Sequence, residues 1–220
     1  MAINLIAPMR DLGFDFSIVA QRAGGELWDR LPEGTSAFCL GARSRPAAIL
    51  ALARLFRDRP PDVLMSSSAE AACALLARQI ARAPTRIVLR QHGPFDRDVC
   101  PPFRAAKRVV YRTLLSRSDA FVAVSEGVAD DMAQYFALER SAVTVIYNPA
   151  VTADAAELAK EPIDHPFFVE QTSPIFVGVG RLVGQKDFAT LIAAFAAYRQ
   201  HTPSRLAIIG DGPLRGALEE

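Results

Sequence analysis

Two kinds of hydrophobic segment follow one another along the chain. Short apolar runs predict strands, at residues 36–40, 62–65, 86–90, 120–124, 143–147, 175–179 and 206–209. Longer segments with apolar residues at helical spacing predict helices, at residues 47–56, 71–81, 126–136 and 187–198. Strands and helices alternate on both sides of residue 150, so the sequence predicts an α/β fold with two Rossmann-like halves and parallel sheets.

Three of the runs predict buried strands. Residues 62–65, 120–124 and 175–179 are apolar almost without interruption. Strands of parallel sheets have such continuous apolar sequences when helices cover both faces of the sheet. We therefore expect these three strands to be buried, the one at 175–179 on both faces.

The first twenty residues follow a different order. Residues 1–10 predict a helix, although Pro8 weakens the pattern, and Gly13 would end it. Residues 14–19 alternate and predict a strand. Doubly wound domains usually open on a strand, so we expect the first strand and the loop after it to be missing from this chain.

Serines precede two of the predicted helices. Ser125 is a favoured N-cap residue for the helix at 126–136, where Glu126 complements the helix dipole. Ser66, Ser67 and Ser68 come before the helix at 71–81. We interpret them as N-cap and turn residues, with a polar loop that faces a ligand as the alternative.

A proline-rich stretch separates the two halves. Residues 150–173 show little periodicity apart from a short helix expected near 154–160, and prolines border and interrupt the stretch. We predict an N-terminal Rossmann-like domain at 1–149, a linker at 150–173 and the first part of a C-terminal Rossmann-like domain at 174–220. Both domains are expected to be incomplete in this chain.

The strand at 175–179 leads into a loop that suits an anion. Gly178, Gly180 and Gly184 permit close backbone approach or a positive φ. Arg181 and Lys186 add two cations beyond a strand end, where open α/β sheets bind ligands. A phosphate fits this chemistry. The alternative is an ordinary turn with two solvated charges.

Composition excludes several classes of protein. The chain has 220 residues, a net charge of +1 and 50% hydrophobic residues, so its overall charge gives no argument for nucleic-acid binding. Cys39, Cys73 and Cys100 match no metal-ligand spacing, and we expect reduced thiols and no metal. No apolar run approaches the ~20 residues of a membrane-spanning helix. These features favour a cytoplasmic protein.

Two further features lie in the first half. His92 follows the strand at 86–90, where loops of α/β proteins carry function, and is either a site residue or a structural histidine. Residues 78–117 carry ten arginine or lysine residues and two aspartates, a net charge of +8. This basic window is either a solvated face or a surface that attracts a phosphorylated acceptor or the anionic lipid head groups on the inner face of a membrane.

Several blocks taken together resemble the retaining family 4 glycosyltransferases of GT-B architecture. The resemblance is carried by Val179-Gly-Arg-Leu-Val-Gly-Gln-Lys-Asp-Phe188, Thr190-Leu-Ile192, Ala194-Phe195, Ile208-Ile-Gly-Asp-Gly-Pro-Leu214, Leu218-Glu219, Val124-Ser-Glu-Gly127, Val145-Ile-Tyr-Asn-Pro149 and Pro61-Asp-Val63. Their order and spacing agree with the family from about Gly13 onward.

The resemblance implies a hexosyl-type glycosyltransferase of cell-envelope polysaccharide biosynthesis that retains anomeric configuration. Its donor would be a nucleotide-sugar, UDP- or GDP-linked, and its acceptor a saccharide or a lipid-linked sugar. Arg181 and Lys186 would bind the donor diphosphate beside Gly180, and residues 210–212 (Gly210, Asp211 and Gly212) would line the nucleotide side. His92 would lie near the donor sugar. Family members need neither metal nor other cofactor.

The sequence departs from the family at both ends. The family's first strand with its glycine-rich loop does not precede Met1, and its downstream pair of glutamates has no room before Glu220. The resemblance thus predicts a fragment that is inactive alone. Two alternatives remain, a non-catalytic module that binds nucleotide-sugars and a dinucleotide-dependent enzyme. Against the latter, Gly184 comes one residue late for the dinucleotide motif.

Overall fold

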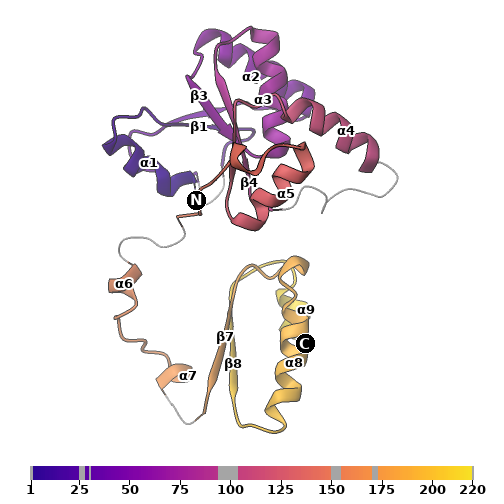
Figure 1. Cartoon of the computed structure of the whole chain (residues 1–220). Coiled ribbons are helices and arrows are strands. Elements are labelled where there is room, and N and C mark those ends of the chain that lie inside the picture. Colours follow the sequence, from indigo (N-terminus) through magenta and orange to yellow (C-terminus); the bar gives the residue numbers. More distant parts are fainter. Residues whose placement is uncertain are drawn as a thin grey trace. The chain divides into compact units, whose positions relative to one another are not determined.

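The computed structural model describes residues 2–24, 28–29, 31–93, 104–149, 155–169 and 173–219. The chain divides into two compact units, Met1–Thr152 and Ala153–Glu220. Figure 1 shows the elements of both units, which are described separately below. The more detailed domain assignment, with a linker at 150–173, stays a prediction.

The first unit is built on parallel strands. β1 (Ser17–Ala20) pairs with β2 (Ser36–Cys39). A second sheet has the order β3 (Val63–Ser66), β4 (Arg86–Gln91), β5 (Ala120–Ala123) and β6 (Val143–Val145). All of these pairs are parallel. The predicted α/β class with parallel sheets is confirmed, and the strand predicted at 14–19 begins only at Ser17.

α1 (Ala2–Asp11) precedes the first strand. The helices that follow strands are α2 (Arg45–Asp58), α3 (Ser68–Ala81), α4 (Arg104–Leu115) and α5 (Glu126–Phe136), and they contribute to the core on one face of the larger sheet. The core joins Phe56 of α2, Leu75 of α3 and Met132 of α5 to Ile87 and Leu89 of β4. The helices predicted at 47–56, 71–81 and 126–136 are confirmed.

The strand predicted at 62–65 is confirmed as β3, but the prediction that it is buried is wrong. β3 is an edge strand of its sheet, and about half of the Val63 and Met65 side chains is exposed. Leu64 pairs in register with Ile87 on the face that the helices cover, whereas Val63 and Met65 lie on the opposite face. β5 has a strand on each side, and its predicted burial is confirmed from Phe121 to Ala123.

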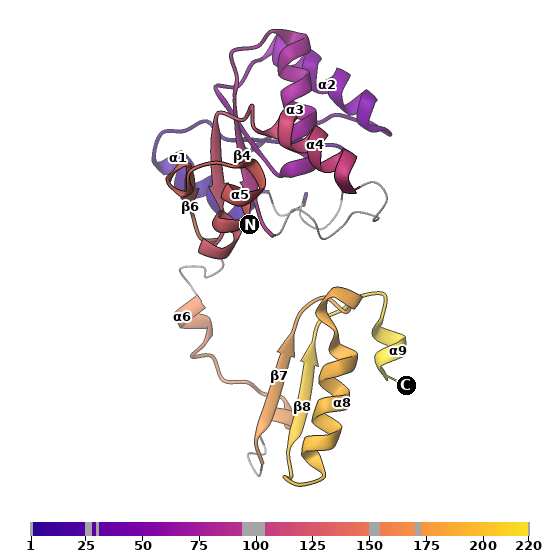
Figure 2. The ribbon, with the colours of Figure 1, turned by 45° about the vertical axis from the view of Figure 1, so that its right-hand side comes forward.

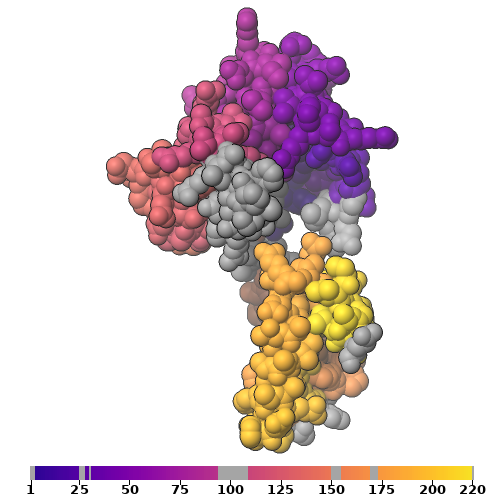
Figure 3. All heavy atoms as spheres, turned by 90° about the vertical axis from the view of Figure 1, so that its right-hand side faces the viewer, coloured from indigo at the N-terminus to yellow at the C-terminus, as the bar shows by residue number. Residues whose placement is uncertain are grey.

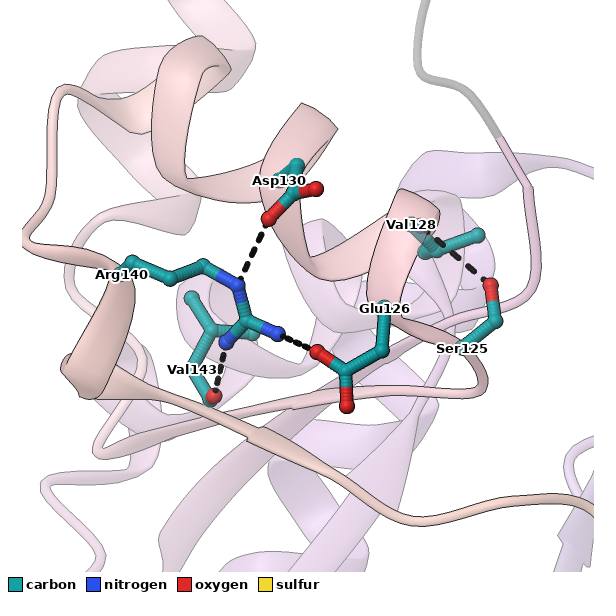
Figure 4. A network of polar contacts seen from close by, with 6 residues as sticks. All are labelled: Ser125, Glu126, Val128, Asp130, Arg140 and Val143. Carbon is teal, nitrogen blue, oxygen red and sulfur yellow. Dashed lines mark hydrogen bonds and ion pairs between the residues drawn. The ribbon is translucent and has the colours of Figure 1, made fainter.

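Capping fixes the start of α5. Ser125 Oγ accepts a hydrogen bond from the amide of Val128 at 3.3 Å, as predicted. Arg140 joins α5 to β6, because it donates to Asp130 at 2.8 Å, to the carbonyl of Val143 at 3.0 Å and to the carboxylate of Glu126 (Figure 4). The network ties the first turns of the helix to the next strand.

The second unit is smaller. Its elements are α6 (Ala155–Leu158), α7 (Pro166–Val169), β7 (Ile175–Val179), the 3₁₀ turn η3 (Gly184–Lys186), α8 (Phe188–Arg199), β8 (Arg205–Ile209) and α9 (Arg215–Glu219). β7 and β8 are parallel, and α8 lies along one face of the pair (Figure 2). Figure 3 views this unit from the side of α8 and α9. The short helix predicted near 154–160 is present, and α7 was not predicted.

The prediction that β7 is buried on both faces is wrong. Phe176 stacks edge-on against Phe195 and Tyr198 of α8, with ring centroids 5.9 and 5.3 Å apart. Alternate side chains point to the other face, where Val177 is 51% and Val179 71% exposed. An apolar run shows that a strand has apolar side chains, but only neighbouring elements can cover them.

No helix within the described ranges is long and apolar enough to cross a membrane.

Candidate functional site

Two loops interlock at the carboxyl ends of β7 and β8. The amide of Gly180 donates to the carbonyl of Ile209 at 3.0 Å, and the amide of Leu182 donates to the carbonyl of Asp211 at 2.9 Å. The amide of Leu214 then donates back to the carbonyl of Leu182 at 3.1 Å. The parallel ladder therefore continues past both strands and fixes the segment 180–182 against 210–214.

Glycine is required where these loops meet. Gly180 and Gly210 have φ values of +157° and +158°. A Cβ atom on Gly210 would lie 1.9 Å from the Gly180 carbonyl oxygen, and one on Gly212 would lie 2.5 Å from the Leu182 carbonyl oxygen. The close backbone approach expected at Gly180 is thus seen between the two loops of the protein itself.

Arg181 and Lys186 lie at the same strand end. Arg181 follows Gly180 and is exposed. The side chain of Lys186 runs over Gly180, since a Cβ there would lie 3.5 Å from Lys186 Cε. Neither cation takes part in any ion pair between described residues. Two exposed cations without such a partner favour an anionic ligand.

The N-terminus of α8 is capped by the protein. Asp187 adopts a left-handed conformation, accepts the amide of Thr190 at 3.4 Å and accepts the Thr190 hydroxyl at 2.9 Å. Lys186 ends a 3₁₀ turn just before this helix. The positive end of the helix dipole already meets a carboxylate, so the anion site depends mainly on Arg181 and Lys186.

His92 lies in the first unit, just past β4. Burial, and then the positive charge of Arg90, lower the pKa of His92, although the residue as a whole is exposed. The imidazole is therefore neutral at pH 7. Next to it, the side chain of Gln91 donates to the carbonyl of Gly93 at 2.6 Å. His92 therefore lies just past the end of a strand in the core and is itself exposed. Its role as a site residue stays a prediction.

Arg90 has a role that no sequence pattern indicated. This side chain is 8% exposed and donates to Asn148 Oδ1 at 2.7 Å, which ties the end of β4 to the segment after β6. A buried cation this close to His92 is the main charge that acts on it. The hydrogen bond between Arg90 and Asn148 also connects two segments that are 58 residues apart in the sequence.

The serines before α3 are either N-cap and turn residues or part of a polar loop that faces a ligand, and Ser66 and Ser67 differ in this respect. Ser67 occupies the N-cap position, but its hydroxyl donates to Glu70 at 2.6 Å instead of accepting an amide. Ser66 Oγ, at the carboxyl end of β3, is buried and has no hydrogen-bond partner among the described residues. Capping therefore explains the position of Ser67 in part, but it does not explain why the Ser66 hydroxyl is buried without a partner among the described residues.

Part of the basic window is structural. Arg78 bonds Asp119 at 2.5 Å, the carbonyl of Thr85 at 3.3 Å and the carbonyl of Arg117 at 3.1 Å. Burial by itself would raise the pKa of Asp119, but the amide of Ile87 together with the bond and charge of Arg78 lowers it. Arg97 lies outside the described residues, as do the side chains of 104, 107 and 108. Membrane contact stays a prediction.

The structure therefore brings six of the predicted residues together. Gly180, Arg181, Lys186 and the turn 210–212 meet at one end of β7 and β8 in the second unit, whereas His92 belongs to the first unit. No group of three or more metal-ligating side chains was found in the described part of the chain.

Comparisons with known proteins place this geometry in context. The sequence model described as Glycosyltransferase Family 4 matches residues 1–154. A search of curated proteins gave no match.

Solved structures share the fold at low identity. One is the apo form of the lipopolysaccharide outer core galactosyltransferase WaaB, with 19% identity and a TM-score of 0.57 over 89% of this chain and 50% of that chain. Another is S. aureus MnaA in a co-structure with UDP, with 14% identity and a TM-score of 0.53 over 91% of this chain and 56% of that one. The chain thus spans about half the length of these proteins, and their similarity supports the GT-B type of α/β fold.

Proposed function

The chain belongs to glycosyltransferase family 4, and we propose that the full-length protein moves a hexosyl group from a nucleotide-sugar to a saccharide or lipid-linked acceptor with retention of configuration. The observation that carries the proposal is the cation pair Arg181 and Lys186 on the glycine-lined ends of β7 and β8. For this chain, which spans about half of the matched proteins, we propose donor binding.

In this proposal the two cations hold the donor diphosphate. As the bond between the sugar and the diphosphate breaks, negative charge grows on the departing phosphate oxygens, and fixed cations stabilise that charge. The planar guanidinium of Arg181 can bind two phosphate oxygens at once, while Lys186 acts as a point charge. The acceptor hydroxyl attacks from the same face and gives its proton to a leaving phosphate oxygen. No metal is needed to neutralise the diphosphate.

The remaining predicted residues take supporting roles. The turn Gly210-Asp211-Gly212 lines the nucleotide side, and its two glycines let the turn lie directly against Gly180 and Leu182. His92 lies near the donor sugar and, as a neutral imidazole, exchanges hydrogen bonds with a sugar hydroxyl without adding charge. The MnaA co-structure contains UDP, so a uridine diphosphate donor is the first one to test.

Calorimetric titration of the chain with UDP and GDP tests donor binding. We expect Arg181→Ala and Lys186→Ala each to weaken binding about tenfold or more, because each removes a charge-assisted contact. Arg199→Ala, which removes an exposed arginine from the last turn of α8, is the matched control and should bind like the wild type. Adding EDTA should change nothing.

Two outcomes would contradict the proposal. If neither nucleotide binds, or if both variants bind as well as the Arg199→Ala control, the cation pair is not a donor site. If the full-length protein binds the donor but transfers no sugar to any saccharide, the non-catalytic binding module replaces the transferase.

A further inference from the structure

A second site candidate lies in the first unit, at the carboxyl ends of β1 and β2. A cavity of about 470 Å³ opens there, lined by Arg22, Ala23, Cys39, Gly41, Ala42 and Arg43. Its volume falls within the ~300–1,000 Å³ of small-molecule sites. The carboxyl ends of parallel strands are also where open α/β sheets bind ligands.

Backbone pairing holds the walls of this cavity. Beyond the strands, the amide of Leu40 donates to the carbonyl of Ala20 at 2.9 Å, and the amide of Ala42 donates to the carbonyl of Gln21 at 3.2 Å. The side chain of Gln21 returns a bond to the carbonyl of Ala42 at 3.2 Å. Arg22 and Arg43 each follow one member of this pair, so the ladder holds their backbones close together.

The cavity is positively charged. Among the described residues, its lining includes two arginines and no carboxylate. Within the described ranges, none of the ion pairs involves either arginine. α2 begins two residues beyond Arg43, which adds the positive end of a helix of 14 residues. Two guanidinium groups beside a helix start favour a dianion such as a phosphate ester.

The space exceeds what a phosphate group needs. A water molecule occupies about 30 Å³ in the liquid, so the cavity has room for a sugar ring beside the phosphate. The small residues Ala23, Gly41 and Ala42 leave that space open, and nothing lies within 4 Å of a Cβ built on Gly41.

We propose that this cavity binds the phosphate monoester of a phosphorylated saccharide, at a site separate from Arg181 and Lys186. Taken with the transfer reaction proposed above, on which this second step rests, the ligand is a phosphorylated acceptor. Arg22 and Arg43 hold its phosphate, and the sugar ring occupies the uncharged part of the cavity.

Cys39 provides the probe, because its exposed thiol lines the cavity. The rate of its alkylation by iodoacetamide in the whole chain is measured by peptide mass spectrometry, with Cys73 as the internal reference. Glucose 6-phosphate at about nine times its dissociation constant should slow alkylation of Cys39 about tenfold. Glucose at the same concentration should leave the rate unchanged.

Two double variants test whether Arg22 and Arg43 are responsible for the protection of Cys39 by glucose 6-phosphate. In Arg22→Ala/Arg43→Ala the affinity for glucose 6-phosphate should fall at least about tenfold. Arg54→Ala/Arg57→Ala, which removes two exposed arginines from α2, should retain the protection. Loss of protection in both double variants would show a general charge effect and overturn the assignment.

Other phosphate ligands distinguish the possible sources of the phosphate. A UDP titration distinguishes this proposal from the donor-site proposal. Protection by inorganic phosphate or by anionic phosphatidylglycerol vesicles, without protection by glucose 6-phosphate, would overturn the saccharide ligand. No protection by any phosphate would overturn the site. UDP binding is measured on the same proteins, so absence of UDP binding with protected Cys39 overturns the donor site alone and still supports this cavity.

Discussion

The two units use similar apolar strands but bury them differently. In the first unit β5 lies between β4 and β6, and Phe121, Val122 and Ala123 are buried. In the second unit β7 has an equally apolar sequence, yet Val179 is 71% exposed. The number of neighbouring strands and helices decides burial, because each strand has two faces and two edges to cover.

This difference changes what orders each candidate site. His92 follows a strand anchored in a core, and Arg90 and Asn148 fix its surroundings. Around Arg181, order comes instead from backbone bonds and from glycine contacts between two loops. Among the described hydrophobic residues of the second unit, only Leu182 and Phe188 are buried.

The largest expected effect contrasts two phenylalanines. Phe56→Ala should lower the free energy of unfolding of the first unit by about 3–5 kcal/mol, because its side chain is 1% exposed in the core. Phe195→Ala should cost the second unit only about 1 kcal/mol, since Phe195 is half-buried. Peptide-level hydrogen exchange in urea separates the units. Equal losses of unfolding free energy in the two variants would contradict the difference between the two units.

The next effect tests whether loop contacts order the second unit. Gly210→Ala should cost about 2–4 kcal/mol, because the new methyl group would meet the Gly180 carbonyl at a positive φ. Exchange of the Gly180 and Leu182 amides should accelerate. Gly184→Ala, with nothing within 4 Å, is the control and should stay within about 0.5 kcal/mol. If Gly210→Ala is as stable as the wild type, the close contact of Gly210 with the Gly180 carbonyl does not order the second unit.

The smallest effect depends on pH and concerns the first unit. The folded-state pKa of Asp119 lies below its unfolded value of about 3.9. Its contribution is therefore present above that value and is lost as the pH falls through the folded-state pKa. Asp119→Asn should cost about 1 kcal/mol at pH 7, since the side chain is 39% exposed, and nothing at low pH.

Urea titrations at pH 7 and pH 3 measure the change in this cost, with Asp130→Asn as the control. Asp130 is 71% exposed and also pairs with an arginine, so its variant should show the smaller cost at pH 7. If Asp119→Asn costs the same at both pH values, the carboxylate of Asp119 does not stabilise the fold through its lowered pKa.

The elements of the candidate site could be predicted because their signals are local. Glycine at 180 and 210, arginine at 181 and lysine at 186 follow strands whose apolar runs define them, and Ser125 caps α5 as its residue type requires. Arg90 was missed because its partner, Asn148, lies 58 residues away. The cavity at Arg22 and Arg43 was missed because it forms only where two separate strands end side by side.

The sequence by itself determined the strands, most of the longer helices and their α/β order, since periodicity and capping depend on residues a few positions apart. Only the tertiary structure decided that Val63 and Val177 stay exposed and that Gly210 lies directly against the Gly180 carbonyl. These outcomes depend on which segments become neighbours, and distant contacts leave no periodic mark in a single sequence.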